Sequence, residues 1–209
     1  MALRYLAAAA GTMPNGLFFA GDSGQRIFQL PFSWKAQGVE VRGRSKNLRV
    51  NYRTSHQIRG HADRLLDPEV TDVDGNVETR KGTVSVFNGP DPLIHIASDE
   101  AQESAFVERW VKDRLNAGYA PHELGVFVRS DAQIARATEA LDRAGCTYRV
   151  LDQKVTTVSG HVSVATMHLA KGLEYRGVAV MACDDEIVPL QARLQEDRKS
   201  TRLNSSHGY

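Results

Sequence analysis

The hydrophobic positions in the second half of the chain follow two alternating periods. Short segments rich in β-branched and apolar residues predict strands over 125–128, 147–151, 162–166 and 178–182. Between them, apolar residues recur at spacings of three and four over 99–117 and 131–144, which predicts two helices. Gly145 directly follows the second of these and suits a helix C-cap. Strands that alternate with helices of this length imply βαβ units, so this half predicts an α/β fold with a parallel sheet.

The first half of the chain shows shorter patterns. A wholly apolar run at 17–20 is typical of a buried strand, and apolar or small residues recur at helical spacing over 55–66 until Pro68. The polar stretch 67–82 contains the turn signal Asp-Gly-Asn at 74–76. We therefore expect a helix over 2–10, a strand over 17–20, a helix over 55–66, a loop over 67–82 and strands over 84–87 and 93–97.

Composition bounds the class of protein without naming a partner. Hydrophobic residues make up 42% and charged residues 24% of the 209, which is globular composition and excludes wholesale disorder. The 26 Lys and Arg nearly balance the 25 Asp and Glu, so any nucleic-acid contact has to be local. Cys146 and Cys183 are too few for a disulfide framework or a zinc cluster. No apolar run reaches the roughly 18 residues of a membrane span, so we expect a cytoplasmic protein with no membrane partner.

Three segments combine residues that suit phosphate chemistry, and the first is 19–28. An apolar run ends there in the corner Gly21-Asp22, and Gln25 follows at the expected carboxyl end of the strand. A neutral amide in that place can orient a water molecule or contact a phosphate, as Gln does in several nucleotide hydrolases. The alternative is a tight turn in which Asp22 caps the next segment.

The second segment is a local basic stretch in a nearly neutral protein. Between Glu40 and Asp63 the chain has no acidic residue, and it carries Arg42, Arg44, Lys46, Arg49, Arg53 and Arg59. Arg53 directly precedes Thr54-Ser55, which is an expected helix N-cap, and an arginine beside a helix N-terminus favours phosphate. The alternative is a solvated charged loop.

The third segment, 164–175, runs from a β-branched strand into a short helical stretch. Thr166, His168 and Lys171 lie at the junction and form a set of donors suited to phosphate groups. The alternative is an isolated histidine and a solvated lysine.

In this order, the three segments resemble motifs of the UvrD/Rep/PcrA group of superfamily 1 DNA helicases. Residues 21–28 resemble motif III, 48–54 motif IV and 166–175 motif V, and the resemblance extends over 17–190. Three ordered motifs are far more specific than any one of them. The resemblance implies a RecA-like parallel sheet flanked by helices, as in the helicase C-terminal domain of P-loop NTPases. It also implies a division into 1–50, a remnant of the first RecA-like domain, and 51–190, the second such domain. Residues 191–209 depart from the family pattern, and we expect them to be an unstructured tail foreign to the fold.

The resemblance also implies roles for single residues. Gln25 and Arg53 would act on the γ-phosphate in catalysis, Tyr52 would stack on adenine, and Glu174 would meet the ribose. The nucleotide-binding set it implies is Asp22, Gln25, Tyr52, Arg53, Gly172 and Glu174. The DNA-binding set is Phe28, Thr166, His168 and Lys171. Phe28 would stack on a base, and Thr166 and His168 would hold the DNA backbone. The cofactor would be ATP with Mg²⁺, and the partners would be single-stranded or partially duplex DNA and the missing N-terminal RecA-like domain of the same polypeptide.

The sequence departs from the family in the parts that phosphoryl transfer needs. No Gly-Lys dipeptide occurs, so the P-loop is absent, and the arginine-finger motif expected after Pro189 is also absent. The Asp-Glu-Ala-Gln run at 99–102 imitates the family's Mg²⁺-holding element but lies between motifs IV and V. It is better explained as a helix start with capping-box spacing, so we expect no metal site.

The leading hypothesis is therefore that the chain is an internal piece of an ATP-dependent DNA helicase and is inactive alone. By resemblance, the movement along DNA would run 3′ to 5′. One alternative is a non-catalytic nucleic-acid-binding or regulatory module with a RecA-like fold. Another is an autonomous enzyme that uses Asp99, Glu100 and the histidines, although the seven histidines show no metal-ligand spacing.

Overall fold

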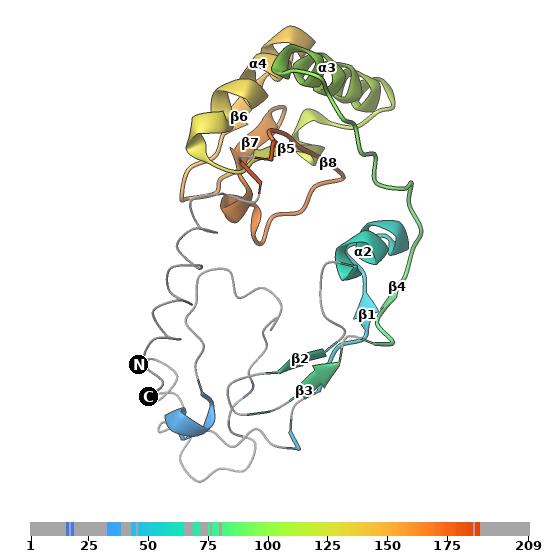
Figure 1. The fold of residues 1–209 in the computed structure, drawn as a ribbon, viewed down its shortest axis with the longest axis vertical. Helices are drawn as coiled ribbons and strands as arrows, with labels where there is room; N and C mark the ends of the chain where they lie inside the picture. The colour runs from blue at the N-terminus through green and yellow to red at the C-terminus, as the bar shows by residue number, and fades with distance from the viewer. Residues whose placement is uncertain are drawn as a thin grey trace, which may run out of the picture. The chain divides into compact units, whose positions relative to one another are not determined.

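The chain divides into two compact units, residues 1–93 and residues 94–209 (Figure 1). The computed structural model describes residues 16, 18, 33–38, 43–44, 46–64, 69–71, 75, 77–79, 81–185 and 187–188. The helix expected over 2–10, the strand expected over 17–20 and the tail expected over 191–209 lie outside the described residues. The predicted division at residue 50 into two RecA-like domains stays a prediction.

The second unit is built on a four-stranded sheet in which every neighbouring pair is parallel. Its strands are β5 (Leu124–Val128), β6 (Tyr148–Val150), β7 (Val162–Thr166) and β8 (Gly177–Val180). Their order across the sheet is β6-β7-β5-β8, so β5 and β7 are central. Both central strands are buried along their whole length, which explains why they contain unbroken apolar or small residues.

Two helices, α3 (Glu100–Asn116) and α4 (Ile134–Ala144), pack against each other and cover one face of this sheet (Figure 1). A 3₁₀ turn, η4 (Asp131–Gln133), leads into α4, and Gly145 ends the helix with a left-handed φ of 69°. The predicted glycine cap is therefore confirmed, because only glycine adopts this conformation without steric cost.

The N-terminus of α3 is fixed by a side-chain cap. The Asp99 carboxylate accepts a hydrogen bond from the Gln102 N–H at 2.8 Å, and the Gln102 amide oxygen accepts one from the Ser98 N–H at 2.7 Å. The hydrogen bonds from the Gln102 N–H and the Ser98 hydroxyl hold the pKa of Asp99 below its ordinary value. The acidic run at 99–102 thus acts as a helix start, as its capping spacing predicted.

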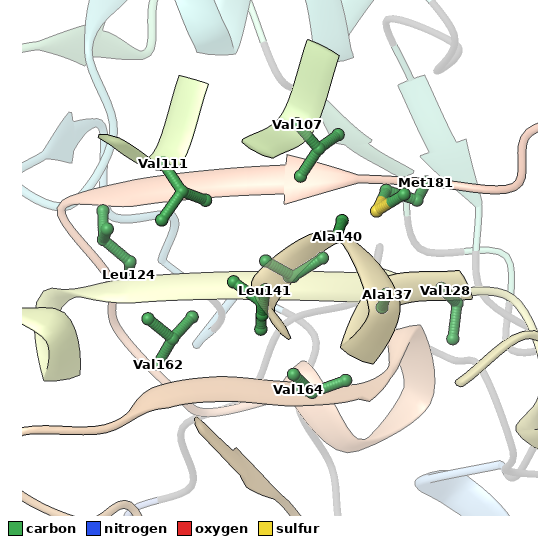
Figure 2. Packing of buried hydrophobic residues seen from close by; sticks show 11 residues of the cluster. Val107, Val111, Leu124, Val128, Ala137, Ala140, Leu141, Val162, Val164 and Met181 are labelled. Carbon is green, nitrogen blue, oxygen red and sulfur yellow. The ribbon is translucent and has the colours of Figure 1, made fainter. Parts of the chain in front are cut away.

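The main core lies between the two helices and the sheet, where small alanines of α4 allow a close approach to β5 and β7. Figure 2 shows side chains of α3, α4, β5 and β7 meeting in this cluster together with Met181, which directly follows β8. Its buried members are Val107, Val111, Leu124, Val126, Val128, Ala137, Ala140, Leu141, Val162, Val164 and Met181.

The opposite face of the sheet carries a smaller cluster beneath the segment 167–175. Phe127, Leu151 and Ala165 form its buried centre. The Phe127 ring meets the Tyr175 ring edge-on, with centroids 5.5 Å apart. A Cβ on Gly125 would lie only 2.6 Å from the Phe127 ring, so glycine is required here to admit the aromatic pair. The segment of the third predicted motif therefore packs onto the sheet.

The first unit contains two short strand pairs and one described α-helix. Strand β1 (Val50–Asn51) pairs parallel with β4 (Val84–Ser85), and α2 (His56–Asp63) follows β1, as predicted for this segment. A 3₁₀ turn, η2 (Lys35–Gln37), precedes them.

The prediction of a loop over 67–82 is wrong in part. Strands β2 (Glu69–Thr71) and β3 (Val77–Thr79) form an antiparallel pair there. Gly75 lies between them with φ of 78°, so the turn signal was correct. The β-branched Val and Thr residues on both sides of the turn favour the strands over a loop.

The prediction of a strand over 93–97 is also wrong. These residues have no strand partner, and Ile94 and Ile96 are 77% and 89% exposed. The His95 ring instead stacks on Phe106 of α3, with centroids 3.9 Å apart. Residues 93 and 94 are the join between the two compact units, which explains why an apolar run is left outside both cores.

These observations confirm the α/β class with parallel strands flanked by helices. Among the described residues, no helix is both long enough and apolar enough to cross a membrane.

Candidate functional site

The first group of predicted site residues lies on a turn that Asn51 holds together at the end of β1. The Asn51 side-chain oxygen accepts hydrogen bonds from the Arg53 N–H at 2.9 Å and the Thr54 N–H at 3.2 Å. Its side-chain nitrogen donates to the Thr54 hydroxyl at 2.6 Å. Tyr52 is 74% exposed, and Arg53 is exposed as well. The turn therefore fixes its own backbone while presenting an aromatic ring and a guanidinium on its surface.

The helix that follows this turn is anchored at its N-terminus. Ser55 is buried, and its hydroxyl accepts a hydrogen bond from the Ile58 N–H at 3.4 Å. The His56 N–H donates to the Phe87 carbonyl at 3.1 Å, and the Gln57 side chain accepts from the Gly89 N–H at 2.8 Å. These contacts tie the start of α2 to the chain after β4, so the predicted N-cap is confirmed and lies directly after Arg53.

One basic residue of this stretch is already committed to an ion pair. Arg59 Nε lies 3.1 Å from the Asp63 carboxylate, one turn later on α2. Arg59 therefore stabilises the helix, whereas Arg53 lies on the exposed turn before it.

The second group lies where β7 reaches the carboxyl edge of the parallel sheet. Thr166 is the last residue of β7 and is buried, and its register partner on β5 is Val128. The Thr166 hydroxyl lies 3.3 Å from Nε2 of the exposed His168. The chain then forms the 3₁₀ turn η5 (Met167–Ala170). The structure thus brings Thr166 and His168 together at the edge where ligands of open α/β sheets bind.

The remaining residues of this segment lie on the turn after η5. Lys171, Gly172 and Glu174 are exposed, and Gly172 has φ of 89°. A side chain at that backbone angle would be strained, so the turn requires its glycine. Thr166 to Glu174 belong to the second unit and Tyr52 and Arg53 to the first. The predicted Asp22, Gln25 and Phe28 lie outside the described residues.

An ionic cluster at the same sheet edge was not predicted from the sequence. Arg136 of α4 contacts Asp184, which follows β8, at 2.6 Å and Glu103 of α3 at 2.5 Å. Glu100 lies 3.4 Å from the same guanidinium. Burial acts to lower the pKa of Arg136, but hydrogen bonds to Asp184 and Glu103 outweigh it and raise the pKa, so the guanidinium stays charged. The three partners are far from Arg136 in sequence, so no local motif indicates the cluster.

The described residues contain no group of three or more His, Cys, Asp or Glu that could hold a metal ion. Asp99, one member of the acidic run, is used as the cap of α3, and Glu100 faces Arg136. Comparisons of the chain with family models, with curated proteins and with solved structures found no match. The motifs and the geometry of the two groups are therefore the basis for any functional assignment.

Proposed function

We propose that the chain is part of a UvrD-like, ATP-dependent DNA helicase or translocase, in which parts of two RecA-like domains couple ATP hydrolysis to movement along single-stranded DNA. The observation that carries this proposal is the turn at 51–54. It offers an exposed aromatic ring and an exposed guanidinium next to a capped helix N-terminus. An aromatic ring can stack on a base, and a guanidinium can pair with phosphoryl oxygens.

The exposed residues fit a nucleotide in chemical terms. Tyr52 would stack on the base, and Arg53 would pair with phosphoryl oxygens, whose charge is best compensated in the transition state. ATP supplies the phosphoryl group whose hydrolysis drives movement, and Mg²⁺ would be held by parts of the catalytic machinery that the chain's motifs do not include.

The second group fits the backbone of a nucleic acid. Thr166, His168 and Lys171 lie within six residues of chain; His168 and Lys171 are exposed, and the buried Thr166 hydroxyl lies 3.3 Å from His168 Nε2. Such donors contact phosphates without reading sequence. We expect this set to bind single-stranded DNA with an affinity that falls as salt rises.

The test measures binding of a labelled oligothymidine to the 209-residue chain by fluorescence anisotropy at several salt concentrations. The double variant His168→Ala/Lys171→Ala should weaken binding several-fold. Lys112→Ala should leave it unchanged, because Lys112 is paired with Glu108 on α3. Binding that neither salt nor the double variant changes would contradict the nucleic-acid part of the proposal.

A fluorescent ATP analogue tests the nucleotide part. Arg53→Ala and Tyr52→Ala should each weaken binding of the analogue, whereas Arg59→Ala should not, because Arg59 is paired with Asp63. Salt-dependent DNA binding without any nucleotide binding would favour the alternative of a non-catalytic nucleic-acid-binding module.

A further inference from the structure

The chain leaves the sheet after β8 through a strained residue. Ala182 has φ of 55°, in the left-handed region that favours glycine, and it is fully buried. The preceding residue, Met181, still donates its N–H to the Phe127 carbonyl at 2.9 Å, as a continuation of the β8 ladder. The direction of the chain therefore changes at Ala182 itself. A strained backbone persists only where the surroundings hold it in place.

Two carboxylates and one guanidinium hold this turn from both sides. The Ala182 N–H donates to one oxygen of the Glu103 carboxylate at 2.8 Å. The other oxygen of Glu103 accepts from Arg136 Nη2 at 2.5 Å, and Arg136 Nη1 donates to Asp184 at 2.6 Å. Arg136 thus links Glu103, which holds the Ala182 N–H, to Asp184, which follows the bend at Ala182. Arg136 and Glu103 are 12% and 20% exposed, so solvent screens their contact less than the contact with Asp184, which is 51% exposed.

The residues after the bend form a turn of their own. The Ile187 and Val188 N–H groups both donate to the Asp184 carbonyl at 2.8 Å. The side chain of Asp184 is held by Arg136, and its backbone carbonyl closes this turn. Because β8 runs parallel to β5, and β5 to β7, the turn leaves the sheet at the carboxyl edge on which Thr166 ends.

We propose that Arg136 is a positioning residue, which keeps Ala182 in its left-handed conformation through Glu103 and thereby orients the turn that Asp184 closes with Ile187 and Val188 at the carboxyl edge of the sheet. The orientation of the turn follows from the geometry alone. Its consequence for DNA at that edge rests on the proposed function.

The test of the positioning role is hydrogen exchange of the Ile187 amide in the full chain, followed by NMR. Arg136→Ala should speed this exchange roughly tenfold while amides of β5 keep their protection, because only the turn is released. Arg136→Lys should restore part of the protection, since an ammonium pairs with only one of the two carboxylates well. Arg143→Ala is the matched control on α4, because the ion pair of Arg143 is with Glu139 of the same helix.

A second substitution separates positioning from general stabilisation. Glycine holds a positive φ without help, so adding Ala182→Gly to Arg136→Ala should return the Ile187 exchange rate toward that of the parent chain. Val155 is the other described non-glycine residue with positive φ, at 50°, and Val155→Gly should give no such rescue. Equal rescue by both glycines would overturn the proposal, as would faster exchange spread evenly over β5 and the turn in Arg136→Lys.

The oligothymidine assay links the turn to the site. Arg136→Ala should weaken binding several-fold, and Ala182→Gly should recover it in the double variant. Faster exchange of the Ile187 amide with unchanged affinity for oligothymidine would refute a role for Arg136 in positioning the turn for DNA. If the parent chain binds no oligothymidine, the proposed function fails, and the exchange experiment still decides whether Arg136 holds the turn.

Discussion

At the scale of single residues, Gly125 shows how the sheet depends on a missing side chain. The Phe127 ring leans over Gly125 and meets Tyr175 edge-on. Gly125→Ala would place a Cβ 2.6 Å from the Phe127 ring and 3.3 Å from the Tyr175 ring. We expect the variant to lose about 1–3 kcal/mol of unfolding free energy, because both rings have to move within a packed cluster.

Urea unfolding followed by circular dichroism measures that loss. The double variant Gly125→Ala/Phe127→Leu should be less destabilised than the sum of its two single changes, because the smaller side chain removes the clash. Additive losses would mean that the ring contact is not the cause.

At Gly60, by contrast, we expect substitution by alanine to increase stability. Gly60 lies inside α2, and a Cβ there would meet nothing within 4 Å. Gly60→Ala should therefore stabilise α2 by about 0.5–1 kcal/mol, because glycine loses more backbone freedom in a helix than alanine does. Slower amide exchange along α2 would report the gain, and faster exchange would show that the helix needs its glycine for another reason.

At the scale of elements, the cap of α3 makes the stability of the helix depend on pH. The pKa of Asp99 is lowered in the folded chain, chiefly by its hydrogen bond from the Gln102 N–H. The stabilisation is therefore fully present above the ordinary carboxyl pKa and is lost as the pH falls through the lowered value. Asn at this position caps the helix without a titrating group.

Thermal unfolding of the parent chain and of Asp99→Asn, followed over a range of acid pH, tests this dependence. The advantage of Asp99 should be present at neutral pH and should vanish in acid. A difference in melting temperature that stays constant with pH would exclude the charged cap as its source.

The elements that the sequence predicts correctly are determined by residues that lie close to one another in the chain. Helix α4 has its periodic apolar face and its Gly145 cap within one short stretch, and the central strands are short segments of apolar and small residues. The run 93–97 is as apolar as those strands, yet a strand forms only where a neighbour supplies hydrogen bonds, and local pattern does not encode the neighbour. The same limit applies to the three-residue strands β2 and β3, which pairing defines.

The residues of the candidate site also fall into two groups, those that a local motif predicts and those that only the fold brings together. Contiguous motifs predict Tyr52, Arg53, Thr166 and His168 as site residues, and Thr166 and His168 lie together. The partners of Arg136 lie 33 and 48 residues away in sequence, so only the packing of α3, α4 and β8 brings them together. Long-range ion pairs of this kind leave no periodic trace in a single sequence.

At the scale of the whole molecule, the join between the two units should be the preferred site of cleavage. Residues 93–97 have no regular secondary structure, and Leu93 is 70% exposed. Brief digestion with thermolysin, which cleaves before large aliphatic residues, should cut before Ile94 and leave a C-terminal fragment that keeps its own core of α3, α4 and the parallel sheet. Mass spectrometry and circular dichroism of that fragment test the expectation. Rapid loss of its helical signal after the cut would show that the second unit depends on the first.

The exposed run at the join also has a consequence for solubility. Leu93, Ile94 and Ile96 form a short uncharged apolar segment, the composition that nucleates cross-β aggregation when chains meet. The flanking residues oppose this, because Pro90 and Pro92 cannot donate to a growing ladder and Asp91 and Asp99 add repulsion. The prolines and aspartates that flank the apolar run therefore oppose its aggregation. We expect Pro92→Ala to raise light scattering on incubation at high protein concentration, and Ile96→Lys to suppress that rise in the same background.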